Sequence, residues 1–597
     1  MGTILKWLVG IFVVIALAFG ALIFGLTRPP APLVPAADLV TIYQGRLQGG
    51  VDRDNPDILQ FNGVPYAASP VGDRRWRPPA APTNWEGVRP AQDFGPECLQ
   101  VRGGSSEFVR DLVEGLGLAW WKRQVAGVVT ASLSSAPESE DCLTLNIRTA
   151  NVGGDALQPV MVWIHGGSHQ SGAGSHELYQ ANQLVENGVV VVTINYRLGA
   201  LGYLAHPVLS MDDPRGVSGN YGMLDQMAAL AWVRENIAAF GGDPANVTVF
   251  GESAGAQSIS EIMASPLSDG LFDKAILQSG SSTYRSIGLT TALDGRPTAH
   301  EVGEALLDGL VPMGASAEDL RAIEGAEIIA AIGERPDLID FLKPVVDGEV
   351  LPRMVGDVIL NGGLPVIPIL AGFNADEATL FYGDTQAPTV LQAPFPKEMN
   401  ARHALLDEIY GKADAAKLIE LYGLHDPALW DDGATDMLGD DIFGVHMRVL
   451  GAVNAQAGAP TWLYHFSRLP PSPRQTLGAF HASEIWFVFN SHSPLMDLSS
   501  NDLRLTQAMG AYWTNFAKYG DPNHEDWATW PAYGPTDEWM EFPTLEDPGP
   551  IQGLRADKLD IMERVLRGRV AAAVPVLTPR QDPGSGGQQA VTDRFEP

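Results

Sequence analysis

The sequence predicts an α/β fold in which a large, mostly parallel sheet is flanked by helices. Short apolar runs bounded by turn residues occur at 159–165, 188–195, 246–251, 274–279, 366–372 and 461–466. Such runs are typical of strands buried on both faces. Between the second and third runs, residues 224–240 carry apolar side chains at helical spacing, and two glycines follow them. Strands and helices therefore alternate, which indicates an α/β sandwich.

Size and composition are compatible with one large domain. The chain has 597 residues, of which 45% are hydrophobic and 18% are charged. This composition excludes a mainly disordered chain. No Gly/Ser-rich linker divides residues 38–570, so we expect a single domain at 38–573. Residues 574–597 lack hydrophobic periodicity, and we expect them to form a disordered tail.

The charge and the cysteine content exclude several classes of protein. The formal net charge is −32, and so acidic a chain repels phosphate backbones, which argues against nucleic-acid binding. Cys98 and Cys142 are the two cysteines. Two cysteines cannot form a disulfide scaffold or a four-cysteine zinc site. They could form one bridge or remain two buried thiols, and their spacing does not decide between these.

The N-terminal segment has the properties of a membrane anchor. Residues 7–27 are nearly continuously apolar and contain no charge. As a helix they would span about 31 Å, the thickness of a bilayer core. We expect an uncleaved signal anchor at 1–28, with a cleaved signal peptide as the alternative, and a Pro-rich linker at 29–37. Either segment would export the rest of the chain, to the periplasm or the extracellular side.

The sharpest motif is GESAG at residues 251–255, which follows a predicted strand and opens a predicted helix. This is the context of a nucleophile elbow, a tight strand-to-helix turn that needs small residues on both sides of its serine. The turn lifts the Ser253 hydroxyl above the sheet edge. It also directs the Ala254 N–H and the helix N-terminus toward the reaction centre. We expect Ser253 to be a catalytic nucleophile.

A second glycine-rich segment, HGGS at residues 165–168, follows the first predicted strand. Glycines let the backbone approach a substrate carbonyl closely, and their N–H groups then stabilise the oxyanion. A plain turn after a strand is the alternative. Because the segment lies upstream of a nucleophile elbow, we interpret it as an oxyanion hole.

A serine nucleophile also needs a base, and in this class of fold the catalytic histidine follows the acid. Spacing alone does not choose among the late histidines, which are His403, His425, His446, His465, His481, His492 and His524. His465 lies inside a predicted strand, where packing is the simpler explanation. His481 lies on an expected loop before an apolar segment, which is a suitable place for a base.

With these motifs in place, the sequence resembles the type-B carboxylesterase family, which includes the cholinesterases, over residues 38–570. The stretches that carry the resemblance are 61–67 (FNGVPYA), 70–79 (PVGDRRWRPP), 140–146 (EDCLTLN), 195–199 (NYRLG), 219–226 (GNYGMLDQ), 240–244 (FGGDP) and 516–523 (FAKYGDPN). The resemblance implies an α/β-hydrolase fold.

The resemblance also implies roles for residues that spacing leaves open. The family's acid is the Glu of a G-x-N-x-D-E stretch, here Glu377, and its base is the His of a G-x-x-H-x-x-E stretch, here His481. Glu484 would then be a carboxylate behind the base. The family pairs its cysteines at the positions of Cys98 and Cys142, which implies a disulfide between them.

Two features depart from the family pattern. The third glycine of the oxyanion stretch is replaced by Ser168, so the expected donors are Gly167, Ser168 and Ala254, with Gly166 as a neighbour. The stretch between the two cysteines is long and contains Trp120-Trp121. In the family this stretch covers the mouth of the active-site gorge.

The sequence therefore predicts an exported serine carboxylesterase that hydrolyses small-molecule esters through an acyl-enzyme intermediate and needs no cofactor or metal. His169 and His176 could line a substrate pocket or bind a metal, but a third ligand at useful spacing is missing, so we interpret them as part of a polar loop. The alternative function is a non-catalytic, cholinesterase-like adhesion or binding module. Such family members typically lack part of the triad, which is complete here.

Overall fold

The computed structural model describes residues 32–573 except 52–54, 102–103, 134–136, 155, 284–285, 294, 381–395, 397 and 545. The predicted anchor at 1–28 and the predicted tail at 574–597 lie outside the described residues. Within the described part of the chain, no helix is both long enough and apolar enough to cross a bilayer. The first strand begins at Val34, so the last residues of the expected linker belong to the sheet.

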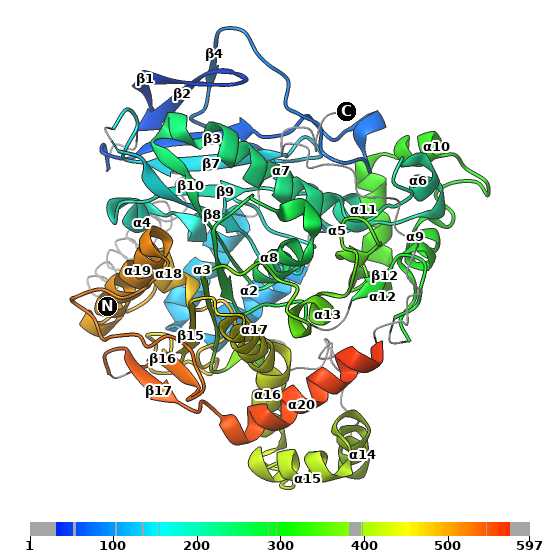
Figure 1. The fold of residues 1–597 in the computed structure, drawn as a ribbon, viewed down its shortest axis with the longest axis vertical. Helices are drawn as coiled ribbons and strands as arrows, with labels where there is room; N and C mark the ends of the chain where they lie inside the picture. Colours follow the sequence, from blue (N-terminus) through cyan, green and yellow to red (C-terminus); the bar gives the residue numbers. More distant parts are fainter. Residues whose placement is uncertain are drawn as a thin grey trace, which may run out of the picture.

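A thirteen-stranded mixed sheet runs through the molecule, in the order β1-β2-β3-β7-β9-β8-β10-β11-β14-β15-β16-β17 with β4 beside β2 (Figure 1). The strands are β1 (Val34–Ile42), β2 (Gly45–Val51), β3 (Leu59–Pro65), β4 (Val88–Pro90), β7 (Thr144–Thr149), β8 (Gln158–Ile164), β9 (Val190–Ile194), β10 (Gly242–Glu252), β11 (Lys274–Gln278), β14 (Ile369–Asn374), β15 (Thr461–Phe466), β16 (Glu538–Phe542) and β17 (Gly549–Gln552). Neighbours from β9 to β16 pair in parallel, as predicted for this part of the chain.

Helices cover both faces of this sheet (Figure 1). They are α2 (Gly104–Gly115), α3 (Trp120–Leu133), α4 (Asn182–Glu186), α5 (Gly199–Tyr203), α6 (Pro207–Asp212), α7 (Tyr221–Asn236), α8 (Ala254–Ala264), α9 (Ala299–Leu307), α10 (Ala317–Arg321), α11 (Gly325–Glu334), α12 (Pro336–Ile339), α13 (Val355–Leu360), α14 (Met399–Tyr410), α15 (Lys412–Leu421), α16 (Trp430–Gly439), α17 (Val445–Gln456), α18 (Ile485–Val488), α19 (Ser500–Tyr519) and α20 (Ala556–Ala573). The predicted helix at 224–240 is α7 with a 3₁₀ turn after it, and it ends at Gly241, whose φ of 80° suits glycine.

The apolar runs reflect burial on both sides of the strands. Along β8, Val160, Val162 and Ile164 pack into an apolar cluster that also contains residues of α7, α8, α17 and α20. Met161 and Trp163 point the other way, into a cluster with residues of α4, α18 and α19. Because successive side chains of a strand alternate between faces, a central strand needs apolar residues at every position.

A third apolar cluster lies beside the sheet and is formed by residues of α5, α6 and α9 to α12. The segment between β11 and β14 supplies most of it. Two short strands, β12 (Ile287–Gly288) and β13 (Val345–Val346), pair in parallel within this segment. Another short pair, β5 (Glu97–Cys98) and β6 (Glu138–Ser139), lies next to the two cysteines.

Candidate active site

Ser253 occupies the turn between the end of β10 and the start of α8. Its φ of 55° and ψ of −123° are rarely adopted by residues other than glycine, and such strain concentrates at functional sites. The turn fits only because its neighbours lack side chains. A Cβ atom at Gly255 would lie 2.0 Å from the carbonyl oxygen of Ile164, and one at Gly251 would lie 2.7 Å from the same oxygen. The strand–turn–helix context predicted from the motif is therefore present.

The segment predicted as the oxyanion hole follows β8, the strand beside β10. It lies against the turn, because a Cβ atom at Gly166 would come within 3.1 Å of the Cβ atom of Ser253. Gly167 has a φ of 103°, and Ser168 has a φ of 56°. The structure thus brings Gly166, Gly167 and Ser168 together with the first residue of α8, Ala254. Ser168 adopts a left-handed conformation that costs a glycine much less.

The histidine and the acid chosen by family resemblance are in direct contact. Glu377 begins a 3₁₀ turn (Glu377–Leu380) immediately after β14, and His481 lies on the loop before α18. The two residues are 104 positions apart in the sequence, yet Nδ1 of His481 lies 2.6 Å from Oε2 of Glu377. Oε1 of Glu377 accepts a hydrogen bond of 2.7 Å from the N–H of Asn374. Both side chains are buried, so this pair is shielded from solvent screening.

The other ring nitrogen of His481 faces Glu252, a residue for which the sequence suggested no role. Nε2 lies 3.0 Å from Oε1 of Glu252, the residue directly before Ser253. Burial alone would lower the pKa of His481, but Glu252 and then Glu377 outweigh it and raise that pKa to about 9. Burial raises the pKa of Glu252 to about 8, against the attraction of His481. The imidazole therefore lies between two buried carboxyl groups, at the base of the Ser253 turn.

A further buried carboxyl, Glu484, connects this site to the sheet. Its Oε2 accepts a hydrogen bond of 2.6 Å from Nδ2 of Asn374, and its Oε1 accepts one of 2.9 Å from Nε2 of Gln278. Asn374 also donates through Nδ2 to the carbonyl oxygen of Phe480. Burial raises the pKa of Glu484. These bonds link the ends of β11 and β14 to the loop that carries His481.

Cys98 and Cys142 form a disulfide, which confirms the pairing implied by the family. The chain between them includes α2 and α3, and this hairpin contacts the segment leading to the loop that carries His481. The N–H of Thr476 donates to the carbonyl oxygen of Gly115 over 2.8 Å. The side chain of Trp120, at the start of α3, is exposed.

Within the described part of the chain, no group of three or more His, Cys, Asp or Glu side chains is arranged to hold a metal ion. The two histidines near the oxyanion segment have protein partners instead. Nε2 of His169 lies 3.1 Å from Oγ of Ser258. Nδ1 of His176 accepts a hydrogen bond from the N–H of Leu178 over 3.3 Å.

A family described as "Carboxylesterase family" matches residues 36–561, which include every residue of this site. The chain belongs to the carboxylesterase family. Its class of activity is accordingly the hydrolysis of carboxylic ester bonds. A fumonisin B1 esterase of Sphingopyxis macrogoltabida is 35% identical over 554 residues, covering 90% of this chain and 92% of that relative. A para-nitrobenzyl esterase of Bacillus subtilis is 35% identical over 510 residues, covering 83% and 92%.

Solved structures of esterases share the same fold. A PNB esterase superposes with a TM-score of 0.71 at 30% identity, covering 88% of this esterase and 100% of that chain. A carboxylesterase of Geobacillus stearothermophilus gives a TM-score of 0.71 at 32% identity, covering 88% and 99%. The large mixed sheet with helices on both faces is therefore the α/β-hydrolase fold expected from the sequence.

Proposed function

We propose that this esterase acts through Ser253 as nucleophile, His481 as general base and Glu377 as the acid that orients it. The observation that carries the proposal is the position of the imidazole. One ring nitrogen binds Glu377 at 2.6 Å, and the other lies 3.0 Å from Glu252, next to the serine. A base that is buried and directed by a carboxylate on one side, with the nucleophile turn on the other, is the arrangement of a serine hydrolase.

The chemistry follows in two halves. His481 takes the proton of the Ser253 hydroxyl as the oxygen attacks the ester carbonyl carbon, and the carbonyl π electrons move to the oxygen. When this tetrahedral intermediate collapses, the C–O bond to the alcohol breaks and His481 returns its proton to the leaving oxygen. Water then attacks the acyl-serine by the same steps and releases the carboxylic acid. Glu377 orients the imidazole and stabilises the imidazolium.

Backbone N–H groups of Gly167, Ser168 and Ala254 are the proposed donors to the oxyanion. They belong to two segments that meet at Ser253, as the contact between Gly166 and the serine indicates. Removing one donor from such a hole typically costs about 100- to 1,000-fold in kcat. Donors that are part of the backbone need no side-chain reorganisation during the reaction.

Small-molecule esters are the proposed substrates, and export is the proposed destination. The family and the relatives named as esterases support the first proposal. The apolar segment at 7–27 and the Cys98–Cys142 disulfide support the second, since disulfides persist in oxidising compartments. Fractionation of cells that produce the tagged full-length chain, with protease added outside the membrane, tests the export. If the chain resists the added protease to the same extent as a cytosolic marker protein does, the export proposal is contradicted.

Replacing Ser253 with Ala tests the mechanism. We expect loss of p-nitrophenyl acetate, butyrate and octanoate hydrolysis, and loss of the covalent organophosphate adduct, with an unchanged thermal unfolding temperature. Ser500→Ala, at an exposed position on α19, is the matched control and should retain both. Turnover by Ser253→Ala would refute the assignment. A folded wild-type protein that neither turns over these esters nor forms the adduct would favour the non-catalytic binding module.

A further inference from the structure

Ser168 and His169 are consecutive non-glycine residues in the left-handed region, with φ values of 56° and 61°. Such conformations persist only where surrounding contacts hold them. Ser168 carries one of the proposed donor N–H groups, and Gly167 beside it carries another. Whatever fixes His169 therefore also fixes the direction of these N–H groups.

The ring of His169 is anchored on α8, the helix that begins directly after Ser253. The side chain is only 2% exposed, and its Nε2 lies 3.1 Å from Oγ of Ser258. Nε2 of Gln226 donates to the same hydroxyl over 3.1 Å, so Ser258 is held from two sides. The edge of the ring contacts Tyr203, with centroids 5.2 Å apart, and the N–H of Gly199 donates to the carbonyl oxygen of His169 over 2.7 Å.

The surroundings keep His169 neutral. Burial, with smaller contributions from Lys343 and His165, lowers the pKa of His169 to about 3. Oε2 of Glu261 lies 3.9 Å from Nε2 of His169, and burial raises the pKa of Glu261 to about 8. Near neutral pH the imidazole is thus uncharged, and its Nε2 shares one hydrogen bond with the Ser258 hydroxyl.

We propose that His169 is a positioning residue for the oxyanion hole, acting through its hydrogen bond to Ser258. The hole needs donors from two segments, the loop after β8 and the first turn of α8. The His169–Ser258 bond connects these segments by side chains and sets the loop N–H groups relative to the N–H of Ala254. This proposal rests on the proposed function, because it assigns a role within that mechanism. The competing explanation is that His169 only packs the interior.

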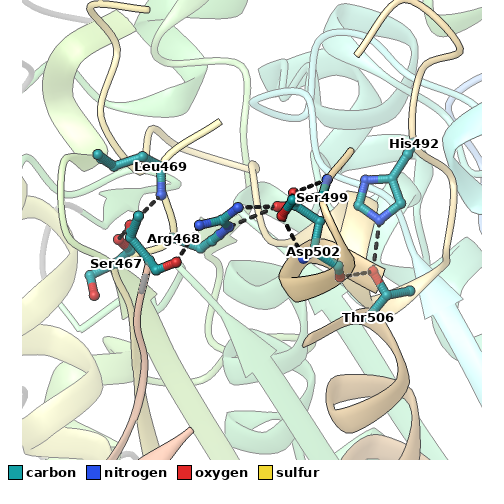
Figure 2. A network of polar contacts seen from close by, with 8 residues as sticks. Ser467, Arg468, Leu469, His492, Ser499, Asp502 and Thr506 are labelled. Carbon is teal, nitrogen blue, oxygen red and sulfur yellow. Dashed lines mark hydrogen bonds and ion pairs between the residues drawn. The ribbon is translucent and has the colours of Figure 1, made fainter. Parts of the chain in front are cut away.

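The chain offers a matched control for that competing explanation. Nε2 of His492 lies 2.8 Å from Oγ1 of Thr506, a hydroxyl on α19 (Figure 2). Its ring packs perpendicular to that of Phe487, with centroids 4.8 Å apart, and burial lowers its pKa to about 4. His492 is therefore also a neutral histidine bound to a helix hydroxyl beside an aromatic ring. Its ring partner Phe487 belongs to the α18–α19 cluster, on the other face of the sheet from α8.

The experiment compares His169→Phe, His169→Gln, Ser258→Ala, the double variant His169→Phe/Ser258→Ala and His492→Phe in the full-length chain. For each, kcat and KM are measured with p-nitrophenyl butyrate, together with the unfolding temperature. The inhibition constant of an aryl trifluoromethyl ketone is measured as well. Its adduct with the nucleophile carries an oxyanion, so its affinity reports the hole directly. Ser258→Ala removes only a hydroxyl and serves if the histidine variants do not fold.

We expect His169→Phe and Ser258→Ala each to lower kcat by about 10- to 100-fold, less than the loss of a whole donor, with KM within about threefold. Ketone affinity should fall in parallel. The double variant should be no slower than the slower single variant, because both remove the same bond. His169→Gln, which keeps a polar group near Nε2, should recover most of the loss. His492→Phe should lower the unfolding temperature and leave kcat within about twofold.

Three results would overturn the proposal: kcat values of His169→Phe and Ser258→Ala within twofold of wild type, multiplicative losses in the double variant, or an equal loss in His492→Phe. The Ser253→Ala variant distinguishes a failure of the proposed function from a failure of the positioning role alone. If Ser253→Ala still hydrolyses the ester, the mechanism itself is refuted. If Ser253→Ala is inactive while the His169 and Ser258 variants behave as wild type, only the positioning role is refuted.

Discussion

Replacing Glu252 with Gln removes the carboxyl group that faces the imidazole of His481, the proposed base, while keeping the size and shape of the side chain. Serine attack requires neutral His481, because the imidazole must accept the hydroxyl proton. With its pKa raised to about 9, only about 1% of His481 is neutral at pH 7 in the free enzyme. The structure therefore predicts that kcat/KM rises with pH well above neutrality.

The size of the effect can be bounded from the geometry. Opposite unit charges 3.0 Å apart attract by about 5–6 kcal/mol at an effective dielectric constant of about 20. That is an upper bound, since burial raises the pKa of Glu252 itself to about 8 and leaves it partly protonated. The net increase for His481, from 6.5 to about 9, corresponds to about 3.4 kcal/mol. Glu377 and Glu484 also raise the pKa of His481 while burial lowers it, so we expect the loss of Glu252 to lower the midpoint of the pH profile by about 1–2 pH units.

The assay is kcat/KM for p-nitrophenyl butyrate between pH 5 and pH 10, with the spontaneous hydrolysis subtracted. In the Glu252→Gln variant the rising limb should move to lower pH, so that relative activity at pH 7 increases by about 10-fold or more. Glu261→Gln removes a different buried carboxyl, on α8, and should leave the midpoint unchanged. A midpoint that stays in place or moves to higher pH in Glu252→Gln would refute the reasoning.

Three further predictions concern stability. Replacing both Cys98 and Cys142 with Ala should lower the free energy of unfolding by about 3–4 kcal/mol, a value that follows from the length of the loop that the disulfide closes. Urea titration measures the change, and equal urea midpoints for the variant and the wild type would contradict it. Because burial raises the folded-state pKa of Glu261 from 4.5 to about 8, the folded state holds this proton more tightly, and stability is lost as pH rises from about 4.5 to 8. Glu261→Gln should therefore unfold at a higher temperature than wild type at pH 9 but not at pH 5; a gain of equal size at both would exclude titration as the cause. Ser168→Gly should stabilise the fold by about 1 kcal/mol, because glycine accepts the φ of 56° without side-chain strain, and a lower unfolding temperature would contradict this.

The parts of the fold that the sequence predicted are those fixed by local chemistry. Residues 160–164 have apolar side chains at every position because the strand is buried on both faces, and that pattern is visible without tertiary information. The turn at Ser253 was equally predictable, because its tight geometry permits only glycine at Gly251 and Gly255. Seven late histidines looked alike, since the choice depends on an acid 104 residues away.

Two contributors to the site had no distinguishing local signal. Glu252 was visible only as the variable position of a motif, and its contact with His481 arises where the end of β10 meets a loop after β15. His169 was predicted to be part of a polar loop. Its burial and its bond to Ser258 depend on how α8 packs beside the oxyanion segment. Long-range contacts of this kind are set by tertiary packing, which no periodicity along the chain encodes.

The third apolar cluster, formed by α5, α6 and α9 to α12, has a consequence for how this esterase can diversify. Its side chains form a cluster separate from the two that flank the sheet, and Ile287 pairs with Val345 within the long segment that supplies most of it. A satellite core of this kind is stabilised largely by its own contacts. Insertions, deletions and recombination within it can therefore reshape one flank of the molecule while the sheet and the nucleophile turn keep their register.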